Sequence, residues 1–306
     1  MNQQTIITRA IIDAHANLAL PQEHALSTAT SSQQSLGSEN EIYAAVKAAC
    51  AQLGFVDIDA HCVAKAWQHS VARTGLFNAN TWPTEPEDFG MKPWPRADAF
   101  LPCPKNLGLY AVLPDASWVA RMAKAGVPTV QLRFKSDDAR AIDQEVRAAV
   151  EAVKGTDALL FINDHWEAAI EAGAYGVHLG QEDMVDADLI KIRTAKLRLG
   201  LSSHGFAEML RADAFSPSYI ACGAIYPTTL KRMMTAPQGP GRLHWYARLM
   251  RDYPLVAIGG IDASKLSEVL ASGVGSVAVV RALVVAENPE AEAANFQAAI
   301  QLAQGI

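Results

Sequence analysis

The sequence has no cluster of Lys and Arg, and its 306 residues carry a formal net charge of −6. Binding to duplex nucleic acid requires clustered positive charge, so we expect no nucleic-acid partner. No apolar run approaches the ~18 residues that a membrane-spanning helix needs. The first ten residues also lack the basic start and the long apolar stretch of a secretory signal. We therefore expect a soluble, cytoplasmic protein with no membrane partner.

Cysteine is scarce and scattered in this chain. The four cysteines, Cys50, Cys62, Cys103 and Cys222, include no Cys-x-x-Cys pair. This spacing argues against a zinc site and against a disulfide framework. Free cysteine behaves as a small hydrophobic residue, so we expect four reduced, buried thiols.

The composition changes near residue 105. The length allows one large barrel or two ordinary domains, and half of the residues are hydrophobic, which is enough for a sizeable core. Before residue 105, helical spacing predicts helices over residues 1–20, 41–53 and 59–71, the last with Asp59 as its N-cap. Residues 27–40 are rich in Ser, Thr, Gln and Gly and are predicted to form a mobile linker.

From Leu107 onward, short apolar runs alternate with helical patterns eight times. Such repetition indicates parallel strands joined by crossover helices, and the runs are apolar throughout, as in strands buried on both faces. We predict an α/β fold, a (β/α)8 TIM barrel over residues 106–306, preceded by a partly helical N-terminal extension over residues 1–105. An open dinucleotide-binding sheet is disfavoured, because no Gly-x-Gly-x-x-Gly turn follows the first run. The predicted strands are residues 107–112, 129–133, 158–162, 176–179, 197–201, 219–224, 255–258 and 276–280.

Residues 82–104, here called the strap, contain six prolines and the aromatics Trp82, Phe89, Trp94 and Phe100. Proline lacks a backbone donor and fixes φ, so the strap should be extended and outside any sheet. Large aromatics left in water would form an exposed patch. We expect the strap to pack on the outer helices of the barrel or to close its N-terminal end, far from the chemistry.

Charged residues stand where the predicted strands end, and in barrels of this kind the active site lies at those carboxyl ends. Asp164 and Asp183 follow neighbouring strands and can share Mg²⁺, which accepts one or two carboxylates and leaves other positions to water and phosphate oxygens. Arg133, Lys135 and Lys231 can neutralise the rest of a pyrophosphate. The pattern predicts a site for Mg²⁺ and phosphorylated small molecules, with an N-cap role as the alternative for Asp164.

Glycine marks a second predicted anion site. Gly259 and Gly260 close the seventh strand, and Asp262 is expected to open a helix. Loops after strands seven and eight often bind phosphate in these barrels, although a simple tight turn is the alternative. Two histidines stay open: His178 is expected to be a hydrogen-bonded core residue, and His204 to cap a helix, face solvent or act in catalysis.

Six motifs, met in order between residues 106 and 303, resemble those of the thiamine phosphate synthase family. They are Val-Gln-Leu-Arg-Phe-Lys, Ile-Asn-Asp, Gly-Val-His-Leu-Gly-Gln-Glu-Asp, Gly-Leu-Ser-Ser-His, Tyr-Pro-Thr-Thr-Leu-Lys and Ala-Ile-Gly-Gly-Ile. The run from Gly176 to Asp183 is the most specific. The resemblance implies condensation of a pyrimidine pyrophosphate with thiazole phosphate, giving thiamine phosphate and pyrophosphate by a dissociative mechanism.

The resemblance also implies roles for individual residues. Asp164 and Asp183 would hold Mg²⁺, and Arg133, Lys135 and Lys231 would be catalytic. The pyrimidine substrate would be bound by the segment Gln131, Leu132, Arg133, Phe134 and Lys135, together with Asn163, Ser202 and Lys231. Thiazole phosphate would be bound by Thr228, Thr229, Leu230, Gly260, Val280 and Arg281.

Three residues depart from the pattern of the family. Leu230 stands where a second Thr is usual, Arg281 where a small hydroxyl residue is usual, and Phe134 where an acid is common. Arg281 can replace the lost hydroxyl contacts with a charge. Two other functions stay open, a thiazole tautomerase of the same barrel family and a non-catalytic regulator that binds thiamine precursors. Asp183 favours the synthase, because the tautomerase has no need of that acid. The sequence carries no signal for an oligomeric state.

Overall fold

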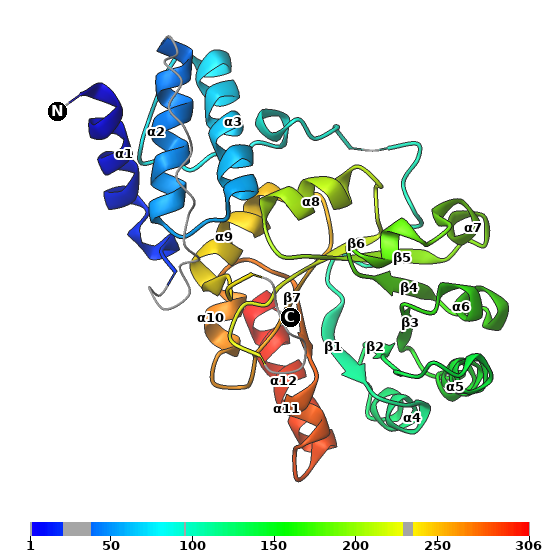
Figure 1. The fold of residues 1–306 in the computed structure, drawn as a ribbon. Helices are drawn as coiled ribbons and strands as arrows, with labels where there is room; N and C mark the ends of the chain where they lie inside the picture. The colour runs from blue at the N-terminus through cyan, green and yellow to red at the C-terminus, as the bar shows by residue number, and fades with distance from the viewer. Residues whose placement is uncertain (1, 21–37, 95, 229–234, 306) are drawn as a thin grey trace.

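The computed structural model describes residues 2–20, 38–94, 96–228 and 235–305 (Figure 1). Eight parallel strands form a closed barrel in chain order, and β8 pairs back onto β1. The predicted (β/α)8 TIM barrel and its partly helical extension are confirmed. The strands are β1 (Gly108–Leu113), β2 (Thr129–Leu132), β3 (Leu159–Asn163), β4 (Gly176–Leu179), β5 (Arg198–Ser203), β6 (Tyr219–Cys222), β7 (Leu255–Ile258) and β8 (Ser276–Val279).

Helices surround the barrel in the order that the sequence pattern predicts (Figure 1). Asp138 illustrates how they begin: its side chain accepts hydrogen bonds from the first amides of α5, and Val146 and Ala149 turn the buried face inward. The barrel helices are α4 (Ala116–Lys124), α5 (Ala139–Ala152), α6 (Trp166–Ala172), α7 (Leu189–Thr194), α8 (Phe206–Asp213), α9 (Gly239–Leu249), α10 (Leu266–Leu270), α11 (Arg281–Val284) and α12 (Pro289–Gln304).

Large side chains fill the inside of the barrel below its mouth. Tyr110, Phe161 and Tyr219 lie there against one another, with the rings of Phe161 and Tyr219 edge to face at 5.0 Å. Gly200 makes room for this layer, since a Cβ at that position would lie 2.1 Å from the ring of Tyr219. The layer forms the floor on which the site is built.

Three helices form most of the extension: α1 (Gln3–Ala14), α2 (Ser38–Gln52) and α3 (Asp57–Thr74), with a 3-10 turn (Ala16–Leu18) after α1. The predicted linker was too long, because α2 begins at Ser38, and its residues 27–37 lie outside the described residues. The N-cap prediction for Asp59 was wrong. Val56 caps α3, and the buried Asp59 instead accepts a hydrogen bond from the main-chain N–H of Ala207, at the start of α8.

Arg242 of α9 is the main polar anchor between the extension and the barrel. Its guanidinium donates to the carbonyl oxygens of Leu18 at 3.1 Å and of Leu53 at 2.8 Å, and it lies 3.7 Å from the ring centroid of Phe55. Arg242 is 2% exposed, so these contacts satisfy a buried charge. The extension is therefore part of the packed structure.

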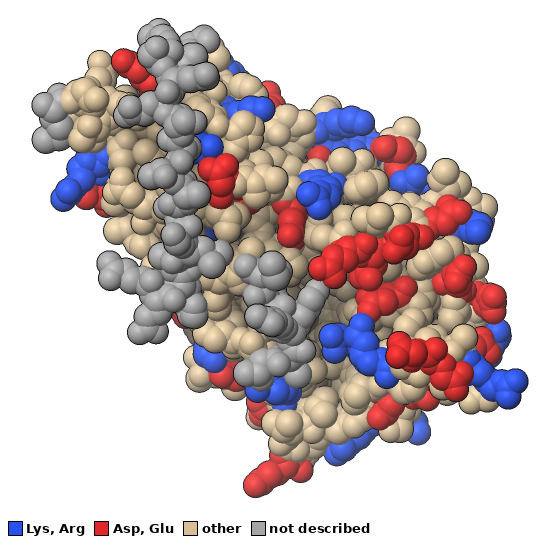
Figure 2. Space-filling model, viewed as in Figure 1, with Lys and Arg blue, Asp and Glu red and all other residues tan. Residues whose placement is uncertain are grey.

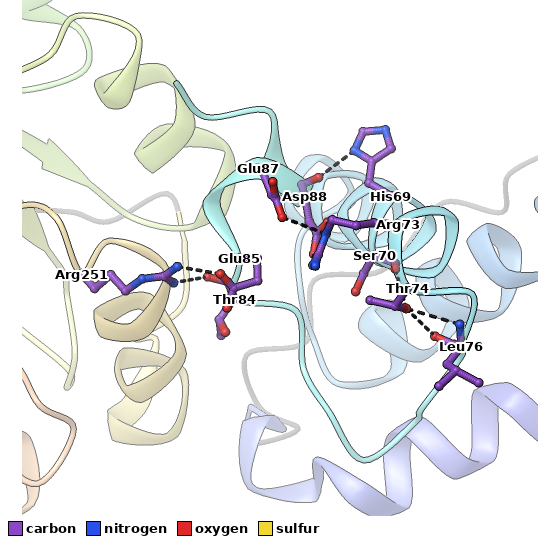
Figure 3. Close-up of polar contacts among 10 residues, drawn as sticks. All are labelled: His69, Ser70, Arg73, Thr74, Leu76, Thr84, Glu85, Glu87, Asp88 and Arg251. Atoms are coloured by element: carbon purple, nitrogen blue, oxygen red, sulfur yellow. Dashed lines mark hydrogen bonds and ion pairs between the residues drawn. The ribbon is translucent and has the colours of Figure 1, made fainter. Parts of the chain in front are cut away.

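The strap begins at the outer helices, as predicted. Trp82 is buried against Phe55 and Phe206, and Phe89 stacks on Phe206 with ring centroids 5.6 Å apart. Figure 3 shows this beginning of the strap, where Arg251 donates to the carbonyl oxygen of Thr84 and pairs with Glu85.

The strap ends at the N-terminal side of the barrel. The amide of Phe100 donates to the carbonyl oxygen of Ser216, which lies between α8 and β6. Arg198, the first residue of β5, donates to the carbonyl oxygen of Pro102. Apart from a 3-10 turn at Pro86–Phe89, the described part of the strap has no regular secondary structure. Its predicted place outside the sheet and its packing on the barrel agree with the structure.

The four cysteines are free thiols, of which Cys50 and Cys222 are buried while Cys62 and Cys103 are partly exposed. The prediction of four buried thiols was thus correct for two of them. Within the described ranges, no helix combines the length and the apolar character needed to cross a membrane.

Arg96 provides a test of how strongly the strap is held. Its guanidinium lies 2.6 Å from Asp213 at the end of α8, and the two side chains are 3% and 7% exposed. Removal of one partner leaves a buried, unpaired charge, so Arg96→Ala should lower the free energy of unfolding by about 3–5 kcal/mol. Arg9→Ala is the control: it removes an exposed pair with Asp13 and should change stability by less than about 1 kcal/mol. Urea denaturation measures both, and equal values for the two variants would contradict this account.

Candidate active site

A cavity of about 600 Å³ opens at the carboxyl ends of the barrel strands. Most of the residues that the sequence placed in the site line this cavity, contributed by seven of the eight strands or the loops that follow them. They are Gln131, Arg133, Lys135, Asn163, Asp164, Asp183, Ser202, Thr228, Gly260, Val280 and Arg281.

Two predicted substrate-binding residues do not line the cavity. Leu132 is buried and packs in the core between the barrel and its helices, and Phe134 packs against the same core. The alternation along an extended chain turns both side chains away from Gln131, Arg133 and Lys135, and their predicted contact with substrate stays a prediction. The predicted residues Thr229, Leu230 and Lys231 lie outside the described residues.

A chain of hydrogen bonds crosses the floor of the cavity. Tyr110 donates its hydroxyl hydrogen to Gln131 Oε1 at 2.8 Å, and Gln131 Nε2 donates to Asn163 Oδ1 at 2.8 Å. The hydroxyls of Tyr110 and Tyr219 lie 2.7 Å apart. Burial raises the pKa of both tyrosines, so both remain neutral hydroxyls at physiological pH. Each member fixes its neighbour, which orients the amides of Gln131 and Asn163.

His178 extends this chain to the fifth strand. Its Nδ1 lies 2.7 Å from the hydroxyl of Tyr219, and its Nε2 lies 2.8 Å from the hydroxyl of Ser202. The prediction of a hydrogen-bonded core histidine is confirmed. His178 also lines the cavity. No pattern in the sequence indicated that one network would link residues from six strands.

The two predicted metal ligands lie together at the rim. Lys135 Nζ is 2.5 Å from Asp164 Oδ2, and Asp183 Oδ2 accepts a hydrogen bond from the amide of Gly180 at 2.8 Å. Burial raises the pKa of Asp183, and the negative charge of Asp164 raises it further. The N-cap alternative for Asp164 fails, since His165 occupies the N-cap of α6.

This donor set fits a hard divalent cation. Two carboxylates that disfavour each other's charge are stabilised by a cation placed between them, and oxygen ligands suit Mg²⁺. Throughout the described ranges, no group of three or more His, Cys, Asp or Glu side chains is arranged to hold a metal. Two carboxylates leave the remaining positions of such an ion to water and phosphate oxygens. On the face shown in Figure 2, acidic side chains gather beside a group of basic ones.

Gly260 brings the seventh strand close to the loop after the sixth. Its φ is +65°, and a Cβ there would lie 2.5 Å from the carbonyl oxygen of Pro227. The predicted glycine turn is therefore required for backbone approach. Asp262 does not open a helix as predicted, because α10 begins at Leu266; Asp262 instead pairs with Lys265 at 2.8 Å. Lys265 lines the cavity and was missed by the sequence analysis.

His204 also faces the cavity, at the end of the fifth strand. Its Nδ1 lies 2.6 Å from Glu208 Oε2, and its amide donates to the same oxygen at 2.9 Å. Burial alone would raise the pKa of Glu208, but the hydrogen bonds from His204 outweigh it and lower that pKa. Glu208 therefore stays ionised and fixes the orientation of the imidazole.

Tyr110 and Tyr219 are the other site residues that the sequence analysis missed. Both stand inside apolar strands, where a tyrosine is an ordinary core residue. The alternation from Tyr110 to Val112 does mark the inward face of β1, and that signal could have found the first of them.

The sequence of this chain is similar to sequences of known proteins. Residues 109–283, more than half of the chain, match the sequence model of a family described as thiamine monophosphate synthase. The thiamine-phosphate synthase of Neisseria meningitidis serogroup A is 55% identical over 199 residues, which cover 65% of this chain and 97% of that protein. The thiamine-phosphate synthase of Serratia proteamaculans is 48% identical over 206 residues, which cover 67% of this chain and 96% of that protein.

The fold is also similar to that of a solved structure. The thiamine phosphate pyrophosphorylase of Pyrococcus furiosus superposes with a TM-score of 0.58 at 26% identity, covering 65% of this chain and 98% of that one. The matched family region lies within the barrel and leaves the extension outside it. The strand-end motifs, the cavity that they line and the match over residues 109–283 together show that this chain belongs to the thiamine monophosphate synthase family.

Proposed function

We propose that this chain is a transferase of thiamine biosynthesis. It would condense 4-amino-2-methyl-5-(diphosphooxymethyl)pyrimidine with thiazole phosphate, giving thiamine phosphate and pyrophosphate. The observation that carries the proposal is the mouth of the barrel, where Asp164 and Asp183 lie in one cavity with Arg133 and Lys135. This set of charges suits a leaving pyrophosphate.

The proposed chemistry needs charge stabilisation and no nucleophile from the protein. As the C–O bond to pyrophosphate breaks, negative charge develops on the leaving group and positive charge on the pyrimidine methylene. Arg133 and Lys135 would neutralise the leaving group, and Lys231 would join them by resemblance to the family. The thiazole nitrogen then forms the new C–N bond. Binding both substrates in one cavity would further lower the activation barrier, because the reacting atoms are held close together and correctly oriented.

We propose that Asp164 and Asp183 hold Mg²⁺. When bound, the ion would offset charge on the pyrophosphate. The acids would fix its place at the rim, and release of Asp164 from Lys135 would free that ammonium group for the substrate. Because the pKa of Asp183 is raised, protonation should compete with the ion at a higher pH than for an ordinary carboxylate.

The two substrates would occupy different sides of the cavity. Asn163 and Gln131, which are hydrogen-bonded to each other, and Ser202, which is hydrogen-bonded to His178, would present fixed donors and acceptors to a pyrimidine ring. Thiazole phosphate would lie toward β7 and β8, where Gly260 and Arg281 line the cavity. Arg281 would then supply a charge where relatives of this type usually carry a small hydroxyl.

The curated relatives reported above are synthases, which favours this function over the thiazole tautomerase and over a non-catalytic regulator. Release of pyrophosphate from the two substrates in the presence of Mg²⁺ tests all three. A synthase releases it, whereas a tautomerase or a regulator does not. We also propose a cytoplasmic location, because the four cysteines are unpaired thiols.

Asp183→Asn tests the metal assignment. Loss of one of two carboxylates should weaken charge stabilisation of the leaving group and lower turnover by about 100-fold or more. Steady-state rates over a range of Mg²⁺ concentrations measure the effect. Asp186→Asn, which changes an exposed acid outside the cavity, is the control and should retain its rate. Wild-type turnover of Asp183→Asn at every Mg²⁺ concentration would refute the assignment.

Arg281→Ala tests the thiazole phosphate position. Removal of a charge-assisted contact should raise the KM for thiazole phosphate by about tenfold or more and leave the KM for the pyrimidine substrate nearly unchanged. Arg281→Lys keeps the charge and should recover part of the loss. Equal increases in both constants for Arg281→Ala would place this residue elsewhere.

A further inference from the structure

The helix α8 begins without a capping side chain of its own. Its N-cap residue is Gly205, and no side chain of the N-cap accepts a hydrogen bond there. The first amides of a helix have no partner within the helix, and Ser, Thr, Asp or Asn usually supplies one at the N-cap. Asp59 of the extension supplies it here, since its Oδ1 accepts a hydrogen bond from the amide of Ala207 at 2.8 Å.

Gly205 and Asp59 fit each other closely. A Cβ at Gly205 would lie 2.1 Å from Asp59 Oδ2, so any side chain there would displace the carboxylate. The backbone of Gly205 is extended, with φ 174°, and a residue with a side chain can adopt that conformation. Space for Asp59, and not backbone freedom, is therefore what requires glycine at this position.

Asp59 is buried, so placing its charged carboxylate at the start of α8 costs desolvation free energy. Burial raises the pKa of Asp59 to about 6, although the amides of α8 and the charge of Arg242 both lower it. Acidic side chains are rarely buried unless they have a hydrogen-bond partner or a paired charge. For Asp59, that partner is the main-chain amide of Ala207 at the start of α8.

The start of α8 is directly tied to the site. Glu208 in its first turn accepts from both the amide and the imidazole of His204. Ser202 and Ser203 end β5, His204 follows them, and all three line the cavity. Glu208 of the helix therefore holds the loop between β5 and α8 in place. Asp59 in turn stabilises the first turn of that helix. In Figure 1, α3 packs beside α8.

We infer that Asp59 is a positioning residue for the active site: by capping α8 from the extension, it holds Ser202 and His204 where the pyrimidine pyrophosphate binds. This inference rests on the proposed function. Asp59 lies outside the region that matches the family, so the extension contributes to a site whose other known elements all belong to the barrel. Since Gly260 and Arg281 follow other strands, thiazole phosphate should not sense the cap.

The experiment is a double-mutant cycle on the full chain. Asp59→Ala should raise the KM for the pyrimidine pyrophosphate by about fivefold to tenfold, the size of a lost helix cap, and leave the KM for thiazole phosphate unchanged. Gly205→Ser alone should have a similar effect, because its side chain displaces the carboxylate. The double variant Asp59→Ala with Gly205→Ser regains space and gains a cap within the helix, so its KM should return to within about twofold of the wild type.

Two controls separate positioning from loss of fold. Asp57→Ala removes an exposed acid two residues away on the same helix, paired with Lys47 at 3.0 Å, and should change neither KM. Amide hydrogen exchange at Ala207 and Glu208 needs no substrate. It should be faster in Asp59→Ala and return to the wild-type rate in the double variant. All variants are compared at a temperature where circular dichroism shows them fully folded.

The outcomes are distinct. Unchanged exchange in Asp59→Ala, equal increases in both KM values, or a double variant no better than the single ones would overturn the inference. If the wild-type chain fails to release pyrophosphate, the proposed function fails instead. The affinity for inorganic pyrophosphate with Mg²⁺, measured by calorimetry, then replaces KM. An equal affinity in wild type and Asp59→Ala would overturn the inference in that case as well.

Discussion

Closure of the eight parallel strands is the constraint on which the rest of this structure depends. A closed barrel has no free edge, and its parallel strands deliver every carboxyl end to the same mouth. Residues separated by more than a hundred positions, such as Gln131 and Arg281, thereby line one cavity. Closure of the barrel is therefore sufficient to place the acidic and basic side chains of the site in one cavity.

Closure also creates a narrow interior that must be filled. Tyr110, Phe161 and Tyr219 fill it, and buried hydroxyls must then find partners. Tyr110 and Tyr219 pair with each other and with residues of the site, so the filling of the barrel and the orientation of the site are one network. The cavity begins where this filling ends, and its floor is already ordered.

Much of this arrangement could be predicted from the sequence, because it depends on local patterns. Apolar runs gave all eight strands to within two residues at every end, and eleven of the site residues predicted at or after those ends line the cavity. Asp59 shows what local patterns miss. It looks like a capping residue and is one, but the amide that it caps lies 148 residues further along the chain. No spacing rule carries that information.

The pairing of Gly205 with Asp59 also restricts which substitutions this chain can accept. With any side chain at position 205, an acid at position 59 would have been buried without its helix amides, which is unfavourable. A glycine at 205 without the acid leaves only a poorly capped helix, a much smaller defect. The two positions are therefore unequal: position 59 accepts another residue at the cost of a weaker helix start, whereas position 205 accepts a side chain only when the acid at position 59 is replaced as well.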